Sequence, residues 1–346
     1  IHVPLSIEAR AEARFLMLST NNILKPADGK PVVSPSQDIV IGCFYLTMDE
    51  NPNKISSDRR FFRNTAEAKM AYQLKQISLQ KEIEVRVEKL DVNGNKVAKR
   101  VKTTVGKIIF NEAVPQDIYY GLDKGELADE NKTVLNPNDN TTVEFKINSR
   151  IGKKQLSVIV DKVFAAKGAT ETAIVLDKIK AIGYKFSTIS GNTASIFDMH
   201  VPSDKQEILE SASKRVQQIE RGHRMGSVTE ESRYRQTIDI WSDAKDQVKK
   251  ILESNKDVYN PVWMMAESGA RGSINQIIQL VGMRGIMAST SGRAIELPIK
   301  ASYKEGLSVL EYFISAYGGR KGMADTALKT ADSGYLTRRL VDEIGR

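Results

Sequence analysis

The sequence predicts an α+β fold, with a mixed, β-containing N-terminal part and a mainly helical remainder. From residue 81 to residue 110 apolar and polar residues alternate, which is typical of a β-hairpin. From residue 154 onward apolar residues recur at helical spacing instead. Segments 203–254 and 306–346 are long enough for an antiparallel helical hairpin and a long C-terminal helix.

Two helices and a strand are expected before the hairpin. Residues 5–19 and 64–78 have helical patterns, and Thr65 is a plausible N-cap of the second helix. The apolar face of the first helix carries Leu5, Ala9, Ala13 and Leu16. Between the two helices, the apolar run DIVIGCFYLTM over residues 38–48 predicts a buried strand.

The hairpin of residues 81–110 is expected to separate charged from apolar side chains. One face of its first strand carries Glu82, Glu84, Arg86 and Glu88, and the other carries Ile83, Val85, Val87 and Leu90. The dipeptide Asn93-Gly94 favours a tight hairpin turn. The acidic, turn-rich stretch 121–145 is expected to be an exposed loop.

Three helices are expected between residues 170 and 254. Residues 170–182 are amphipathic, and Gly183 is expected to end that helix. Residues 203–221 and 229–254 form two longer helices, and the short link around Gly222–Gly226 requires them to be antiparallel. Their start signals are the capping-box spacing of Ser203 with Gln206, and Thr229 as a second N-cap. This hairpin is either a docking surface for partners or a structural bracket.

The positive charge is concentrated in one stretch. Residues 51–110 hold 14 Lys and Arg against 6 Asp and Glu, which accounts for the whole formal net charge of +8. This stretch is either a solvated basic surface or an attractor of phosphate backbone. The length of 346 residues suggests two or three domains.

Several classes of protein are excluded by what the sequence lacks. No apolar run reaches ~18 residues, so no transmembrane helix is expected. Cys43 is the single cysteine, which excludes a disulfide framework and a cysteine zinc site, and we expect a cytoplasmic protein. The three histidines show no metal-ligand spacing. The N-terminus lacks an initiator Met and a signal sequence, so we expect an internal piece of a longer chain.

Two glycine-rich segments near the C-terminus contain the residues that most indicate ligand binding. In MMAESGARGSINQIIQLVGMRGIM (264–287), Arg271 and Arg284 each lie beside a glycine. Glycine allows close backbone approach while a guanidinium reaches an anion, so a phosphate-bearing ligand is the natural candidate. Ordinary surface or salt-bridging arginines are the alternative.

The second segment, 306–346, has leucines at helical spacing and four interior glycines: Gly318, Gly319, Gly322 and Gly334. Each glycine costs a helix ~1 kcal/mol relative to alanine. A helix that must bend, or a backbone that a bulky ligand touches, would explain them. Scattered basic residues suit a helix that crosses a cleft and contacts nucleic acid. The alternative is two shorter helices with a glycine joint.

These segments resemble the family of bacterial-type RNA polymerase beta-prime subunits. GGRKGMADTALKTADSGYLTRRLV (318–341) closely resembles the family's bridge helix. NPVWMMAESGARGSINQIIQLVGMRGIM (260–287) is similar to the segment with the F-loop, which braces that helix. HVPLSIEARAEARFLMLSTNNILKPADGKPVVSPSQD (2–38) resembles the stretch that follows the family's catalytic aspartate loop. TTVGKIIFNEAVP (103–115) and GYKFSTISG (183–191) match pore and funnel portions.

The resemblance implies a domain order and a role. It gives residues 1–20 as the tail of the active-site domain, 21–165 as the pore domain, 166–258 as the funnel domain with the rim-helix hairpin 203–254, and 259–346 as the F-loop and bridge-helix segment. The chain would be part of the catalytic subunit of DNA-directed RNA polymerase. It would line the channel through which NTPs enter and supply the bridge helix for template-directed RNA synthesis. A non-catalytic scaffold or regulatory paralogue is the alternative.

The resemblance also assigns residues. Arg271 matches the family arginine near the incoming triphosphate. The bridge-helix residues expected near template or RNA are Arg320, Lys321, Thr330, Ala331, Tyr335 and Arg338. Gly318, Gly319 and Gly322 are the expected hinge. The family usually has Gly-Ala-Arg where this sequence has Gly318-Gly319-Arg320, so the hinge should be looser here.

Cofactors and partners follow from the family in the same way. The aspartate loop that holds the catalytic Mg, expected just before Ile1, and the family's zinc-binding cysteines lie outside this sequence, so no catalytic or metal residue is expected within it. The chain alone is not expected to be active. Expected partners are the beta, alpha, omega and sigma subunits, template DNA, RNA, NTPs, and secondary-channel factors at the rim helices, with no membrane.

Overall fold

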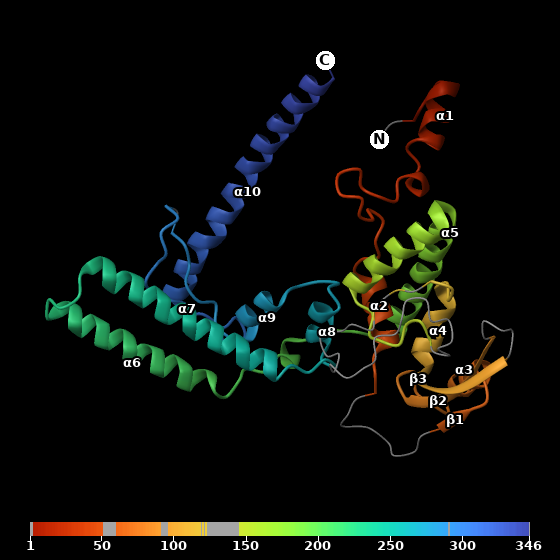
Figure 1. Ribbon diagram of the computed structural model, residues 1–346. Coiled ribbons are helices and arrows are strands. Elements are labelled where there is room, and N and C mark those ends of the chain that lie inside the picture. Colours follow the sequence, from red (N-terminus) through yellow and green to blue (C-terminus); the bar gives the residue numbers. More distant parts are fainter. Residues whose placement is uncertain are drawn as a thin grey trace. The chain divides into compact units, whose positions relative to one another are not determined.

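The computed structural model describes residues 3–50, 60–90, 96–118, 120, 122, 145–289 and 291–345. It contains two compact units, shown with their elements in Figure 1. The first unit comprises Ile1–Thr193 and Trp263–Gly272, and the second comprises Ala194–Val262 and Ser273–Arg346. Helices predominate and the described strands form one small sheet, so the predicted α+β class with mainly helical content is confirmed. The predicted domain boundaries stay predictions.

The first unit packs helices around a three-stranded sheet and a long helix. Its helices are α1 (Ile7–Phe15), α2 (Asp38–Thr47), α3 (Thr65–Gln73), α4 (Val105–Ala113) and α5 (Lys153–Ser190), with a short 3-10 helix η1 (Ser19–Asn21). Its strands are β1 (Arg60–Phe62), β2 (Glu82–Leu90) and β3 (Lys96–Thr104). Helix α8 (Pro261–Glu267) crosses the boundary into this unit. In the sheet β2 lies between its neighbours, parallel to β1 and antiparallel to β3.

The buried strand predicted for residues 38–48 is wrong, because this segment is helix α2. Seven of its ten residues are buried, so apolar side chains point in every direction and leave no helical period in the sequence. Close packing against α5 requires glycine in both helices. A Cβ on Gly42 would overlap the Gly183 carbonyl, and one on Gly183 would overlap Ile39.

The predicted pairing of two antiparallel strands is confirmed for residues 82–90 and 96–104, with Val85 opposite Val101 in the register. Ile83 and Val85 are fully buried beneath the sheet. Residues 105–110, predicted as its continuation, instead begin helix α4, whose N-cap Thr104 accepts a hydrogen bond from the Lys107 amide. The Asn93-Gly94 turn and, apart from residues 122 and 145, the acidic loop 121–145 lie outside the described residues.

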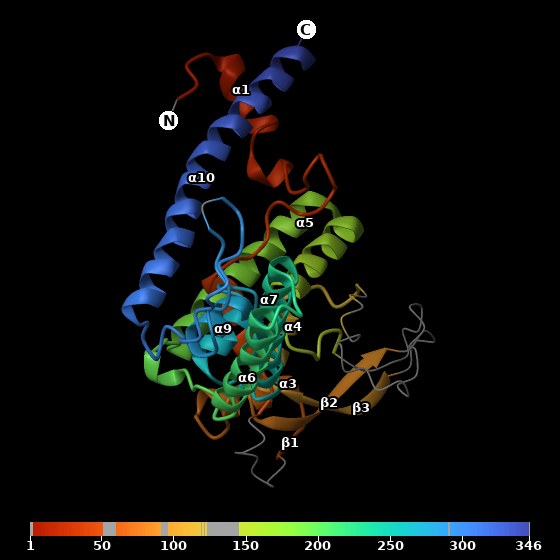
Figure 2. The same cartoon turned by 90° about the vertical axis from the view of Figure 1, so that its left-hand side faces the viewer.

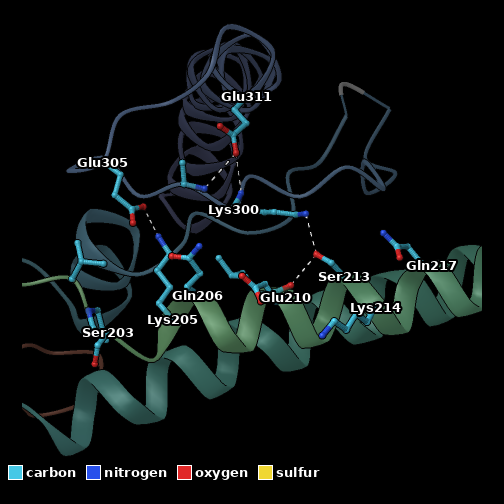
Figure 3. Close-up of a pocket in the computed structure, with 14 residues that line it drawn as sticks. Ser203, Lys205, Gln206, Glu210, Ser213, Lys214, Gln217, Lys300, Glu305 and Glu311 are labelled. Carbon is cyan, nitrogen blue, oxygen red and sulfur yellow. Dashed lines mark hydrogen bonds and ion pairs between the residues drawn. The ribbon is translucent and has the colours of Figure 1, made fainter.

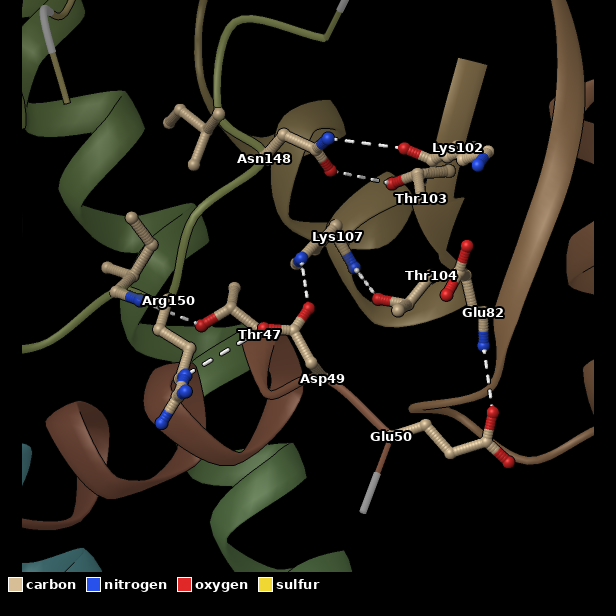
Figure 4. A network of polar contacts seen from close by, with 12 residues as sticks. Thr47, Asp49, Glu50, Glu82, Lys102, Thr103, Thr104, Lys107, Asn148 and Arg150 are labelled. Atoms are coloured by element: carbon tan, nitrogen blue, oxygen red, sulfur yellow. Dashed lines mark hydrogen bonds and ion pairs between the residues drawn. The ribbon is translucent and has the colours of Figure 1, made fainter. Parts of the chain in front are cut away.

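A buried lysine ties three helices of this unit together (Figure 4). The Lys107 side chain on α4 is 7% exposed, and its Nζ lies 2.5 Å from Asp49 Oδ1, just after α2. Arg150 Nε lies 3.8 Å from the other oxygen of Asp49. Thr47 Oγ1 at the end of α2 accepts a hydrogen bond from the Ile151 amide, which precedes α5. A buried cation is costly without a partner, so Asp49 stabilises this junction.

Two predicted helix ends in the first unit need correction. Gly183 does not end the helix predicted for 170–182. It lies inside α5, which ends at the left-handed Gly191 and has a break at Gly168, where φ is 76°. Gly183 serves close packing on α2 instead. At α3 the N-cap is Asn64 rather than Thr65, since the Asn64 side chain accepts a hydrogen bond from the Glu67 amide.

The second unit is built from a helical hairpin and a long C-terminal helix, seen from a second direction in Figure 2. Its helices are η3 (Ile196–Asp198), α6 (Lys205–Arg224), α7 (Glu230–Ser254), α9 (Ile274–Val281) and α10 (Val309–Ile344). The predicted antiparallel hairpin is confirmed as α6 and α7, whose seam buries Ala212, Trp241 and Ala244 together with Met283.

The predicted N-caps of this hairpin have different outcomes. Thr229 caps α7 as predicted, because its hydroxyl accepts a hydrogen bond from the Ser232 amide at 3.4 Å. The capping box of Ser203 with Gln206 is wrong. Asp204 is the N-cap of α6 without a side-chain cap, and the Ser203 hydroxyl donates to the Asp204 carboxylate.

Helix α10 is one continuous helix of 36 residues, so the alternative of two shorter helices is wrong. It begins with a capping box, in which the Ser308 hydroxyl accepts from the Glu311 amide and the Glu311 carboxylate accepts from the Ser308 amide. Ile314 and Ser315 are its only buried residues. A helix of this length with so little burial does not derive its stability from contacts within the described residues.

Candidate nucleotide and nucleic-acid interface

One side of α10 is lined by small residues between two arginines. At 3.6 residues per turn, Arg320 and Arg338 fall on the same side of the helix, ~27 Å apart along its axis. The exposed small residues on that side are Ala324, Ala327, Ala331 and Gly334. The side that packs on the rest of the unit, marked by buried Ile314, lies on the other side of the helix. This small-residue face lets a flat or bulky partner approach the backbone closely.

Of the other predicted contact residues of α10, Thr330 and Tyr335 flank that face and Lys321 does not. The Thr330 hydroxyl donates to the Thr326 carbonyl at 2.7 Å, which leaves its methyl group for contact. Tyr335 is 62% exposed, and the Arg339 guanidinium lies 4.6 Å from its ring centre. Arg338 Nε lies 3.9 Å from Asp342, an exposed pair that contributes little stability. Lys321 points the other way, and its Nζ donates to the Ser289 carbonyl at 3.3 Å.

The three predicted hinge glycines have different surroundings. A Cβ on Gly318 would overlap the methyl group of Met287, so this glycine makes room for a neighbour. A Cβ on Gly319 or Gly322 would meet nothing within 4 Å. All three have helical conformation here. Packing therefore explains Gly318, whereas the other two are not explained by any contact of the described residues.

Arg271 is exposed on a tight turn in the first unit. Gly269 and Gly272 on either side have positive φ values of 73° and 80°, which non-glycine residues rarely adopt. The turn is fixed to the start of α5, because the Lys153 amide donates to the Ser268 carbonyl at 2.8 Å. The Arg271 amide donates to the Met265 carbonyl at 3.2 Å. The backbone is thus held while the guanidinium remains at the surface.

Arg284, the second arginine singled out for an anion, has a different environment. It is half-buried in the second unit, and its guanidinium lies 5.0 Å from the Tyr303 ring centre. Its Nε is buried without a hydrogen-bond partner among the described residues. Burial lowers the pKa of Arg284. The structure therefore places this side chain in a packed aromatic contact, and brings it together with no other predicted site residue.

A polar groove of about 850 Å³ runs between α6 and the connector that precedes α10 (Figure 3). The Lys205 ammonium, on a side chain that is 6% exposed, pairs with Glu305. Across the groove the Lys300 ammonium donates to Ser213 Oγ at 3.1 Å and lies 4.8 Å from the Trp241 ring centre. These contacts fasten the connector to the hairpin.

Two carboxylates of this connector have lowered pKa values. Burial opposes ionisation of Glu305, but hydrogen bonds from Lys205 and from the Ser302 amide and hydroxyl outweigh it and lower its pKa. For Glu311 burial is likewise outweighed, by hydrogen bonds from Ser308 and from the Ala301 and Lys300 amides, and its pKa is lowered. Sequence reasoning missed both residues. Glu311 had a local signal, the Ser308-x-x-Glu311 spacing, whereas Lys205 and Glu305 are 100 residues apart and had none.

Neither a metal centre nor a membrane-spanning element is found in the described part of the chain. No three His, Cys, Asp or Glu side chains gather there in a way that could hold a metal ion. No described helix combines the length and the apolar character needed to cross a membrane.

Comparisons with known proteins cover nearly the whole chain. Models of RNA polymerase Rpb1 domain 3, domain 4 and domain 5 match residues 22–199, 211–305 and 306–345. DNA-directed RNA polymerase subunit beta' of Caldanaerobacter subterraneus subsp. tengcongensis is 50% identical over 342 residues, 99% of this chain and 28% of the relative. The Clostridium acetobutylicum subunit of that name is 51% identical over the same shares.

The similarity thus extends from the sheet-containing unit to the end of α10, and the chain spans about 28% of the length of these relatives. The family suggested by the glycine-rich segments is the family found by comparison. The chain belongs to the family of DNA-directed RNA polymerase beta-prime subunits.

Proposed function

We propose that this chain is part of the catalytic subunit of DNA-directed RNA polymerase and that α10 is its bridge helix. The observation that carries the proposal is the exposed face of α10, where small residues lie between Arg320 and Arg338. Small side chains allow a base pair to stack close to the backbone, and arginines at either end suit phosphates of the same duplex. Thr330 and Ala331 are the residues proposed to lie against the template base.

Arg271 is proposed to contact the incoming NTP. Nucleotidyl transfer depends largely on positioning and on neutralising the charge of the phosphates. A guanidinium forms paired, charge-assisted hydrogen bonds with phosphate oxygens. The glycine turn supports this role, because it holds the backbone and leaves the Arg271 side chain at the surface. The pore and funnel segments of the first unit are proposed to line the channel through which NTPs reach the site.

The family's metals are proposed to be bound elsewhere. Within the described residues the side chains do not form a metal site, so they do not fit magnesium or zinc. When bound by the rest of the subunit, magnesium would neutralise phosphate charge. The residues of this chain would position nucleic acid and substrate around it.

Partner subunits are proposed to cover the exposed apolar side chains of two helices. On α1, Ile7 is 80% exposed and Phe15 is 71% exposed, and on α10 Leu336 and Ile344 are exposed as well. Apolar side chains along whole helices mark contact surfaces. The proposed partners are the remainder of the beta-prime subunit with the beta, alpha, omega and sigma subunits, and secondary-channel factors at the hairpin of α6 and α7.

Site-specific photo-crosslinking tests the bridge-helix proposal. A photoreactive amino acid at position 331, in the assembled polymerase halted on a radiolabelled template, should crosslink to template DNA near the growing RNA end. The same group at Arg235, exposed on α7, is the matched control and should not. Crosslinks from both positions or from neither, in an enzyme that still extends RNA, would contradict the proposal. An assembled enzyme that cannot extend RNA would favour the scaffold alternative.

A further inference from the structure

A closed loop of the second unit, residues 285–289 and 291–299, contacts both α7 and α10. The loop is held across its base by paired hydrogen bonds between Gly285 and Ile299, both 3.0 Å. Further along, the Ile295 amide donates to the Met287 carbonyl and the Ser289 amide to the Arg293 carbonyl, both at 2.8 Å. The two arms of the loop are therefore fixed to each other, and a displacement of one displaces the other.

One arm of the loop is bound to α7 by an ion pair. Arg233 Nη1 and Nη2 lie 2.8 Å and 3.1 Å from the two carboxylate oxygens of Glu296, a paired geometry. The hydroxyl of Tyr234 donates to the Ala294 carbonyl at 3.1 Å, and the Arg293 guanidinium lies 4.3 Å from the Tyr234 ring centre. Two adjacent residues of α7 thus contact three positions of this arm, 293, 294 and 296.

The other arm of the loop contacts α10 at the glycine-rich part of the helix. The Met287 methyl group occupies the space that a Cβ on Gly318 would need. One helical turn on, the Lys321 ammonium donates to the Ser289 carbonyl at 3.3 Å. These are the contacts that place the loop beside the proposed hinge of α10.

Arg233 also contacts the tip of the hairpin of α6 and α7. Arg233 Nε and Nη2 lie 3.0 Å and 2.5 Å from the carboxylate oxygens of Glu230, in the first turn of α7. Glu230 Oε2 lies 3.2 Å from Nε2 of His223, in the last turn of α6. The hydrogen bonds that Arg233 donates to Glu230 and Glu296 raise the pKa of Arg233, so it stays charged. The Arg233 side chain is 16% exposed and that of Glu296 is 37% exposed, so the arginine side of the pair is largely covered.

We propose that Arg233 is a positioning residue for α10. Through its ion pair with Glu296 it fixes the loop of residues 285–289 and 291–299, and the loop fixes Gly318 and Lys321 of α10. The tip of the α6–α7 hairpin is thereby coupled to the proposed hinge of the bridge helix. The structural part of this inference, the coupling, stands on the contacts alone. The catalytic part rests on the proposed function.

Hydrogen exchange on the full 346-residue chain tests the coupling. Arg233→Ala should raise amide exchange about tenfold at Ser289 and Ile295 and over residues 318–322 of α10, a factor that corresponds to ~1.4 kcal/mol. Arg235→Ala is the matched control. Arg235 lies two residues after Arg233 on α7 and pairs with Glu231, and both side chains are exposed, at 73% and 74%. Its removal should leave the exchange rates of these segments unchanged.

A variant in which the two charges are exchanged distinguishes the effect of the ion pair from a general loss of stability. Glu296→Arg alone places two arginines together and should loosen the loop, whereas the exchanged variant Arg233→Glu with Glu296→Arg should restore at least part of its protection. Protection in the loop and in residues 318–322 should rise and fall together across the variants. Loop exchange that rises while residues 318–322 remain protected would overturn the coupling. Failure of the exchanged variant to restore any protection would overturn the role of the pair.

Elongation by the assembled polymerase tests the catalytic consequence. Arg233→Ala should change the RNA elongation rate at saturating NTP more than the apparent NTP affinity, because Arg233 is proposed to act through the hinge of α10 and not through an NTP contact. The exchanged variant should recover the rate. A variant with loosened α10 and a wild-type rate would overturn the catalytic part alone. If the wild-type assembly does not extend RNA, the proposed function fails, while the exchange result still decides the coupling.

Discussion

Arg271 stands at the surface of a turn whose backbone is fixed by Gly269 and Gly272 and by a hydrogen bond to the start of α5. The ordering of this turn is complete before any ligand binds, so a phosphate contact would need only the side chain to be ordered. That is the arrangement expected of a residue that receives a small charged ligand. A salt-bridging structural arginine would instead have an acidic partner, and among the described residues no acidic side chain pairs with the exposed Arg271.

The first prediction concerns this residue. Arg271→Ala should raise the apparent dissociation constant for NTP roughly 10- to 150-fold, from ~1.5–3 kcal/mol for charge-assisted hydrogen bonds. Arg271→Lys should recover part of the loss, because it keeps the charge but not the paired geometry. The measurement is single-nucleotide addition over a range of NTP concentrations in assembled polymerase. Lys154→Ala, exposed in the first turn of α5, is the control. Unchanged kinetics would leave Arg271 without a substrate role.

The second prediction concerns Glu305 and acid stability. Its folded pKa lies below 4.5, the ordinary value of a glutamate, so ionised Glu305 stabilises the fold above pH ~4.5, and this contribution is lost as pH falls through the folded pKa. Glu305→Gln should lower the melting temperature at pH 7, because buried Lys205 loses its partner. It should also flatten the fall in melting temperature between about pH 5 and pH 3. Calorimetry across this range is the measurement.

Glu231→Gln is the matched control for Glu305→Gln, since it removes a carboxylate from an exposed pair with Arg235. Surface pairs contribute little, so this variant should keep the wild-type pH profile. A Glu305→Gln profile parallel to that of wild type would show that the carboxylate does not stabilise the fold through its charge.

At the scale of elements, sequence patterns were reliable where one face of an element is buried and the other is exposed. The hairpin of α6 and α7 has such a pattern, and so does β2, where Ile83 and Val85 are buried opposite charged residues. Helix α2 has no exposed face, so its composition suggested a strand. Gly183 resembled a helix end, but its role depends on α2, which lies far away in the sequence. Long-range packing is not visible in local patterns.

The candidate site shows the same limit. The residues of α10 and Arg271 could be named because their segments resemble a family, and the structure adds which of them share a face. The ion pairs of Lys205 with Glu305 and of Arg233 with Glu296 join residues 100 and 63 positions apart. Neither pair has a local motif, because any surface lysine or glutamate has the same sequence signature. Contacts of this kind require the tertiary structure.

The third prediction concerns the glycines of α10. The Cβ that Gly319→Ala or Gly322→Ala adds would meet no other atom within 4 Å. Each substitution should therefore stabilise the straight helix by ~1 kcal/mol. If these glycines permit bending during translocation, the combined variant should alter elongation rate or pausing in assembled polymerase. Ser333→Ala, at an exposed position of the same helix, is the control, since it raises helix propensity by roughly half as much without removing a glycine. Unchanged pausing with intact assembly would contradict hinge function.

Gly318 behaves differently in this test. A Cβ there must displace the end of the Met287 side chain, which is flexible, so Gly318→Ala should gain less helix stability than Gly319→Ala. Adding Met287→Ala should remove the difference between the two positions. This comparison shows whether packing or backbone freedom explains the glycine at 318.

The fourth prediction concerns the tip of the hairpin. Residues 221–228 comprise the last turn of α6 and most of its link to α7, and Met225 at this tip is 83% exposed. Replacing these residues with a short neutral turn should leave basal elongation near normal and reduce transcript cleavage stimulated by secondary-channel factors. Matched substitution of exposed residues in the C-terminal part of α7, such as Gln247 and Lys250, is the control. Equal factor binding and cleavage with the altered tip would make the hairpin a structural bracket.

At the scale of the whole molecule, the described residues supply surfaces rather than a complete site. Helix α10 exposes apolar side chains along most of its length, and α1 has no buried residue at all. A chain that is stable by itself would bury the apolar side chains of these helices. The chain spans 28% of the length of its relatives, and under the proposed function other parts of the polymerase would cover these helices. Stability of α10 should therefore depend on assembly.

The last prediction follows from this dependence. The isolated chain should not extend a primer on a template with magnesium and NTPs, because the family's aspartate loop is not in its sequence and no metal-binding group of three forms among the described residues. In the isolated chain, amides of α10 beyond residue 325 should exchange rapidly, since nothing described covers them. In the assembled polymerase the same amides should be protected.

The two measurements are made on the same preparations, with assembled polymerase as the positive control for extension. Magnesium-dependent extension by the isolated chain that is abolished by Arg271→Ala would contradict the prediction, since a contaminating polymerase would not respond to that substitution. Equal protection of α10 in the two states would show that the helix is stable by itself, and the exposed apolar side chains would then need an explanation other than assembly.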